Sequence, residues 1–151
     1  MFIKGNTYGS KTKRGKNKVD ADLKAKLKDI TNEILDSIIE QMQIDFEAAT
    51  GEKIIPLNYW GHIHEKNMST NMHNHYDCYV SAVVYLEVPE GSGSIVFLPK
   101  LNQYNNSAYK SKFAPERGVY YIFPGYLDHF VTRNMSDQFR ISLSMNFKKD
   151  E

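Results

Sequence analysis

The sequence predicts a mainly β fold, in which one long helix precedes about seven short strands. Two observations lead to this prediction. Apolar residues recur at three- and four-residue spacing only between Asp22 and about Ala49. From Lys53 onward, short runs rich in Val, Ile, Tyr and Phe alternate with turn residues. One helix followed by many short strands favours a barrel or a sandwich, with the helix packed on one sheet.

The predicted helix has recognisable ends. Asp20 or Asp22 can cap its first turn, and Gly51 follows its last turn as a terminating glycine does. Its apolar stripe needs a large apolar surface to lie on, so we assign the helix a structural role. The residues of the stripe are Leu23, Leu27, Ile30, Ile34, Ile38 and Met42.

The predicted strands are short and separated by turn-forming residues such as Pro124-Gly125. Two polar stretches without periodicity, 65–70 and 100–112, are expected to be loops. Strands are expected over residues 54–64, 79–88, 94–98, 119–123, 127–132 and 139–147.

Length and composition indicate one globular domain. With 151 residues, we expect a single domain over residues 20–151, preceded by a flexible basic arm over residues 1–19. The net charge of +1 gives no global field that would favour nucleic acid or a membrane. Cys78, the single cysteine, excludes an intramolecular disulfide and suits a reducing cytosol. No segment resembles a signal peptide or a membrane span, so we expect a cytoplasmic protein.

A candidate metal site lies among the histidines. His75 and Asp77 are two residues apart, so in an extended segment both project to the same face. His129 lies far along the chain on another predicted strand. Two histidines and one carboxylate form the facial triad that leaves three positions open on Fe(II).

The last predicted strand carries an anion-binding pattern. Arg140 and Ser142 share a polar face, while Ile141 and Leu143 occupy the opposite, apolar face. If the apolar face lies under the helix, the polar face points into the barrel. A buried arginine is costly unless an anion meets it, and a dicarboxylate supplies that anion in bidentate geometry.

The predicted strand over residues 79–88, which follows the candidate metal ligands, also divides into an apolar face and a polar face. Val80, Ala82 and Val84 make an apolar face. If the extended structure reaches back to residue 75, the opposite face carries His75, Asp77, Tyr79, Ser81 and Tyr85. The candidate ligands and the polar pocket residues then fall on one side.

These residues resemble those of the Fe(II)/2-oxoglutarate-dependent oxygenases, in particular a short group common in bacteria and their viruses. The likeness covers roughly residues 58–147. It rests on Asn58-Tyr59-Trp60, His73-Asn74-His75, the run 81–86, Gly91-Ser92-Gly93, Phe123-Pro124-Gly125, Leu127-Asp128-His129 and Arg140-Ile141-Ser142. Ala82 stands where the group usually has glycine.

The resemblance implies a double-stranded β-helix, that is, a jelly-roll or cupin-like barrel. It implies a dioxygenase that uses Fe(II), 2-oxoglutarate and O₂ to hydroxylate a C–H bond, with release of succinate and CO₂. Iron would be bound by His75, Asp77 and His129, although His73 offers a second choice of first ligand. The cosubstrate would be held by Arg140, Ser142 and Tyr85.

The substrate and two alternative functions stay open at this point. A peptidyl side chain, a small molecule or a nucleic-acid base is possible as substrate. A cupin shares the barrel, but its first motif needs a glutamate where this chain has Tyr79 or Val80. A metal-free β-sandwich that binds or supports another molecule explains neither the inward arginine nor the histidine pattern. His62 and His64 are expected to line the pocket or to be structural rather than to bind metal.

Overall fold

The computed structural model describes residues 2–3, 21–98 and 111–151. The chain divides into two compact units. One contains β1 (Phe2–Ile3) and everything from Ile54 onward, and the other contains the helix. Residues 4–19 of the predicted basic arm and most of the predicted 100–112 loop lie outside the described residues. The predicted boundary between arm and domain therefore stays a prediction.

The helical unit contains α1 (Ala21–Thr50). It ends as the sequence predicts, because Gly51 has a φ of 75° and donates its N–H to the Glu47 carbonyl oxygen at 2.8 Å. Leu35, Ile39 and Met42 are its buried apolar side chains among those described. Packing of the helix on a sheet stays a prediction. No helix of the described residues has the length and apolar character that crossing a membrane requires.

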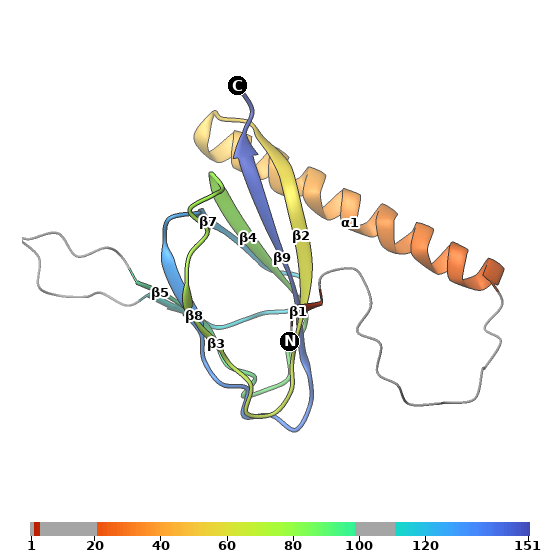
Figure 1. Ribbon diagram of the computed structural model, residues 1–151, viewed down its shortest axis with the longest axis vertical. Coiled ribbons are helices and arrows are strands. Elements are labelled where there is room, and N and C mark those ends of the chain that lie inside the picture. The colour runs from red at the N-terminus through yellow and green to blue at the C-terminus, as the bar shows by residue number, and fades with distance from the viewer. Residues whose placement is uncertain (1, 4–20, 99–110) are drawn as a thin grey trace, which may run out of the picture. The chain divides into compact units, whose positions relative to one another are not determined.

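The larger unit consists of two antiparallel sheets that face each other, as Figure 1 shows. The first sheet has the order β1-β2-β9-β4-β7, and the second has the order β3-β8-β5-β6. From β2 on, the chain changes sheet at every connection except the β5–β6 pair, which is jelly-roll topology. The described strands are β1 (Phe2–Ile3), β2 (Ile54–His64), β3 (Thr70–His73), β4 (Val80–Glu87), β5 (Ile95–Leu98), β6 (Ser111–Phe113), β7 (Tyr120–Pro124), β8 (Asp128–Val131) and β9 (Arg140–Lys149).

The fold class predicted from the sequence is confirmed as a mainly β, double-stranded β-helix. Six predicted strands correspond to β2, β4, β5, β7, β8 and β9. Three strands were not predicted: β1, β3 and β6. All three are at most four residues long, which is too short to give a periodic signal.

The core lies between the sheets. Val83 and Tyr85 of β4 pack with Ile95, Phe97 and Phe123 from β5 and β7. Because β4 is buried along residues 80–85, both of its faces are covered.

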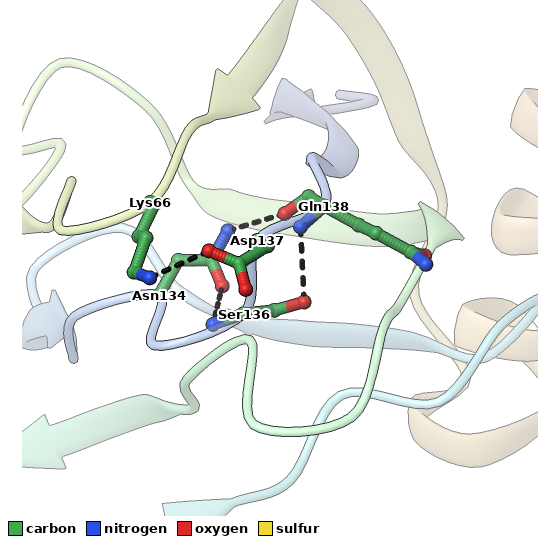
Figure 2. Close-up of polar contacts among 5 residues, drawn as sticks. All are labelled: Lys66, Asn134, Ser136, Asp137 and Gln138. Atoms are coloured by element: carbon green, nitrogen blue, oxygen red, sulfur yellow. Dashed lines mark hydrogen bonds and ion pairs between the residues drawn. The ribbon is translucent and has the colours of Figure 1, made fainter.

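The loop before β9 is fixed by one buried amide (Figure 2). The fully buried Asn134 donates from Nδ2 to the carbonyl oxygens of His64 and Gln138, at 2.8 and 2.9 Å. Its Oδ1 accepts from the N–H of Ser136 at 2.9 Å. Asn134 therefore connects the end of β2 to the segment that leads into Arg140.

Candidate metal and cosubstrate site

One pocket between the sheets collects most of the side chains that the sequence singles out. Residues of β2, β3, β4, β8 and β9 line it, together with His75 just after β3. The polar and titratable lining residues that matter for chemistry are His62, His64, His73, His75, Tyr85, His129, Arg140 and Ser142.

Three histidines gather at this pocket. One candidate ligand atom from each of His73, His75 and His129 lies within 4.8 Å of the others. Imidazole nitrogens that bind one ion at about 2.0–2.1 Å, at tetrahedral or octahedral angles, are about 3–3.5 Å apart, so the rings must approach one another by up to about 1.5–2 Å to complete a metal site. Two of the three predicted ligands, His75 and His129, are thus brought together.

Backbone carbonyls orient two of these rings. Nδ1 of His73 lies 2.8 Å from the Asn71 carbonyl oxygen, and Nδ1 of His129 lies 2.9 Å from the Leu127 carbonyl oxygen. A carbonyl oxygen only accepts, so Nδ1 carries the proton in both rings and Nε2 keeps a free lone pair. This arrangement is how proteins fix the tautomer of a metal-binding histidine.

Burial keeps the rings in the form that binds metal. Desolvation lowers the pKa of His129 to about 4, and it also lowers the pKa of His75. Both imidazoles are therefore neutral near pH 7, which is the form a metal ion binds.

Asp77 is not part of the histidine group. Residues 76–79 form a turn, with the Cys78 N–H donating to the His75 carbonyl oxygen at 3.1 Å. The expectation of an extended segment from His75 to Tyr79 is therefore wrong, and His75 and Asp77 do not share a strand face. Asp77 is exposed, although its charge acts on His75 and opposes the lowering of that pKa. Its assignment as an iron ligand stays a prediction.

A side-chain contact ties the segment between the first two histidines to β8. Asn74 donates from Nδ2 to Oδ1 of Asp128 at 2.5 Å. Because Asn74 lies between His73 and His75, and Asp128 precedes His129, the contact holds the three rings in register. The positions of Asn74 and Asp128 along the chain do not indicate this contact.

Arg140 is almost fully buried, with 1% of its surface exposed. Its Nη1 donates to the Ser92 carbonyl oxygen at 2.8 Å, and its Nε has no partner. Across the β2–β9 pairing, His64 is the register partner of Arg140. Among the described residues, the buried side-chain polar atoms that lack a partner are Arg140 Nε, Ser92 Oγ and His64 Nδ1. All three therefore belong to Arg140 and two of its neighbours.

Tyr85 and Ser142 are register partners on β4 and β9, and both are buried at the pocket. Burial raises the pKa of Tyr85 to about 12, against the opposing influence of the Arg140 charge. Tyr85 is therefore a neutral phenol at physiological pH. The three residues predicted to hold a cosubstrate lie in one pocket with the histidines.

His62 and His64 line the pocket, as predicted. Trp60 donates from Nε1 to Nε2 of His62 at 2.7 Å, so the proton of the neutral His62 ring is on Nδ1. His64 Nε2 lies 2.8 Å from Oγ1 of Thr70. Nε2 of each ring therefore has a hydrogen-bond partner, which fits a role in the pocket wall.

A family model described as "Putative 2OG-Fe(II) oxygenase" matches residues 58–146, more than half of the chain. The chain belongs to this family. The match favours the oxygenase over the cupin and the metal-free sandwich. Oxygenases of this kind use Fe(II), 2-oxoglutarate and O₂. None of the curated proteins matches the chain.

Solved structures share the fold at low sequence identity. An oxidoreductase of the 2OG-Fe(II) oxygenase family from Burkholderia pseudomallei has 19% identity and a TM-score of 0.56, covering 66% of this chain and 47% of its own. A prolyl-4-hydroxylase from Pseudomonas putida has 16% identity and a TM-score of 0.54, covering 75% and 63%. The non-heme alpha ketoglutarate dependent epimerase SnoN, from nogalamycin biosynthesis, has 16% identity and a TM-score of 0.59, covering 70% and 51%. The chain thus spans about half to under two thirds of the length of these structures.

The donor groups of the pocket suit the family's cofactors. Imidazole nitrogens suit Fe(II), and the buried guanidinium with an unpartnered Nε suits a carboxylate. His64 and Ser92 are polar neighbours of Arg140. Sequence reasoning did not assign either of them to the cosubstrate. The unpartnered atoms that identify them become visible only in three dimensions.

Proposed function

We propose that this protein is an Fe(II)- and 2-oxoglutarate-dependent dioxygenase that hydroxylates a C–H bond of its substrate. The overall reaction consumes O₂ and 2-oxoglutarate and releases succinate, CO₂ and the hydroxylated product. The main support is the buried Arg140, whose Nε has no partner, in the pocket that also holds His64, with its unpartnered Nδ1, and the three candidate ligand histidines. A buried cation left with a free donor is what a dicarboxylate cosubstrate needs.

Each pocket residue has a defined role in this proposal. His75 and His129 bind the iron through neutral imidazoles, with the third ligand supplied by Asp77, as the sequence predicts, or by His73. Arg140 holds the distal carboxylate of 2-oxoglutarate, and Ser142 and Tyr85 donate beside it. Bound iron supplies the redox chemistry that no side chain can supply, and the protein contributes orientation and exclusion of water.

The cosubstrate end of the pocket is arranged to favour an anion. His64 is uncharged near pH 7, because burial and the Arg140 charge lower its pKa to about 3. Its unpartnered Nδ1 can then donate to the same carboxylate without adding charge. Arg140 remains the cation that sets the preference for a dianion.

The substrate belongs to one of three classes: a peptidyl side chain, a free small molecule or a nucleic-acid base. A cytoplasmic setting is part of the proposal, and it suits the single, unpaired Cys78.

Anaerobic titration tests the proposal. The purified protein, loaded with one equivalent of Fe(II), is titrated with 2-oxoglutarate while the visible spectrum is recorded. A metal-to-ligand charge-transfer band that saturates is expected, because the keto acid chelates the iron. His129→Ala is the control and should remove both iron and band. Saturating iron occupancy without any band would contradict the proposed cosubstrate.

A further inference from the structure

We propose that His73 is the third metal ligand, so that the centre consists of His73, His75 and His129 without a carboxylate. This inference rests on the metal centre of the proposed function, and it changes the ligand set predicted from the sequence. The ligand group is the only one of its kind that the described residues contain.

His73 and His129 form a symmetric pair on neighbouring strands. They are register partners in the antiparallel pairing of β3 with β8, and their ring centroids lie 4.3 Å apart. Each donates its Nδ1–H to the carbonyl oxygen two residues earlier in the chain. The same local arrangement therefore leaves Nε2 available for a metal ion in both rings, in His129 on β8 and in His73 on β3.

His75 completes the group from the segment that follows β3. Its ring centroid lies 5.1 Å from that of His73 and 5.3 Å from that of His129. Its backbone N–H donates to the Gly125 carbonyl oxygen at 2.7 Å, and its ring stacks on Trp60. These contacts hold His75 in place without any help from Asp77.

The nearby carboxylates are exposed or engaged by another side chain. Asp77 is exposed and is separated from the extended strand by the 76–79 turn. Asp128 accepts the Asn74 amide at 2.5 Å. Neither belongs to the histidine group, so the three imidazoles are the ligands that the fold itself brings together.

The ligand set has a chemical consequence. Three neutral imidazoles leave the full charge of a divalent ion uncompensated, whereas a carboxylate ligand would cancel one unit. The centre should therefore bind a further anionic ligand, such as the keto-acid carboxylate or added azide, more readily than a centre with Asp77 bound. The metals expected are divalent ions that accept imidazole nitrogen, which include Fe(II), Co(II), Ni(II) and Cu(II).

Pulsed EPR on the unmodified protein gives the direct test. Cu(II) at one equivalent replaces iron, and the modulation from the remote ring nitrogens counts the bound imidazoles. Three imidazoles are expected. Two imidazoles would overturn the inference while leaving the proposed function intact, because Asp77 would then be the third ligand.

Two matched variants test the same point by affinity. His73→Ala should weaken Co(II) binding by at least about a hundredfold, since even the loss of a group that only orients a ligand costs about 10–100-fold. Asp77→Asn keeps the size of the side chain and should leave Co(II) affinity within about twofold. Thermal unfolding of the metal-free variants shows whether each is folded. Loss of metal in Asp77→Asn with retention in His73→Ala would overturn the inference. Tight metal binding by three histidines without any 2-oxoglutarate band would instead contradict the proposed cosubstrate alone.

Discussion

Gly125 should be indispensable to the metal centre because the backbone of the His75 loop lies against it. A Cβ added at Gly125 would lie 2.4 Å from the Cys78 carbonyl oxygen and 2.6 Å from that of His75. Ordinary contacts begin at about 3.4 Å, so Gly125→Ala must separate the two segments by about 1 Å. The neighbours are backbone atoms, which cannot swing aside as a side chain can.

The consequences of that separation follow from the hydrogen bonds that cross it. The His75 N–H to Gly125 oxygen bond of 2.7 Å would be stretched to about 3.7 Å and lost, and the Gly125 N–H to Tyr79 oxygen bond would be strained. Overpacking of about 1–3 kcal/mol and one lost hydrogen bond of about 1 kcal/mol give a destabilisation of about 2–4 kcal/mol. In a domain of this size the unfolding midpoint should fall by about 5–15 °C.

Metal binding should fall as well, because His75 moves with its backbone. A displacement of about 1 Å takes one nitrogen out of reach of an ion that the other two hold, and Co(II) affinity should fall by about 10–100-fold. Thermal unfolding and Co(II) titration measure the two effects. Gly61→Ala is the control, since a Cβ there meets nothing within 4 Å, and it should be neutral or stabilise by under about 1 kcal/mol. Equal stability and Co(II) affinity in Gly125→Ala and wild type would refute this reasoning.

Three further predictions concern the cosubstrate, pH and the loop before β9. Arg140→Lys should weaken 2-oxoglutarate binding by about 10–100-fold at unchanged iron occupancy, because lysine lacks the planar fork; equal affinities in anaerobic titration would show that Arg140 does not hold the cosubstrate. Burial lowers the pKa of His62 from 6.5 to about 4, so the unfolded chain takes up a proton first as pH falls. Wild type should therefore lose about 2 kcal/mol more stability between pH 7 and 5 than His62→Gln, as measured by urea unfolding, and identical slopes would contradict a buried neutral ring. Asn134→Ala should cost about 2–3 kcal/mol through three lost hydrogen bonds, whereas Lys66→Ala, which removes only an exposed ion pair, should cost under about 1 kcal/mol.

The long strands and their faces were predictable from the sequence because their patterns are regular. The bounds of β2 match the prediction, and the alternation on β9 correctly placed Arg140 and Ser142 on a buried face. Both strands span ten residues or more, so a shift by one residue would move a long set of side chains to the opposite face.

The arrangement of the candidate metal ligands was less predictable from the sequence, because it depends on a turn and on a short strand. Asp77 was placed beside His75 on the assumption of extended backbone, but the turn at 76–79 breaks the parity. Asn74 and Asp77 are turn-forming residues and would have signalled it. The role that we propose for His73 as a metal ligand depends on its pairing with β8 and on its contact with the Asn71 carbonyl oxygen. The spacing of residues along the chain reveals neither of these.

The position of β9 also determines the order in which this barrel can assemble. β9 follows all the other described strands in the chain, yet it lies in the middle of its sheet, hydrogen-bonded to β2 on one side and β4 on the other. As a ribosome makes the chain, β2 can pair with β1 and β4 with β7, but each keeps one edge unpaired until residues 140–149 emerge. The pairings with β9 are between distant parts of the chain, and they form slowly because a long loop must close first. Arg140 arrives on the same strand, so closure of the barrel would also bring in the residue that we propose to hold the keto acid.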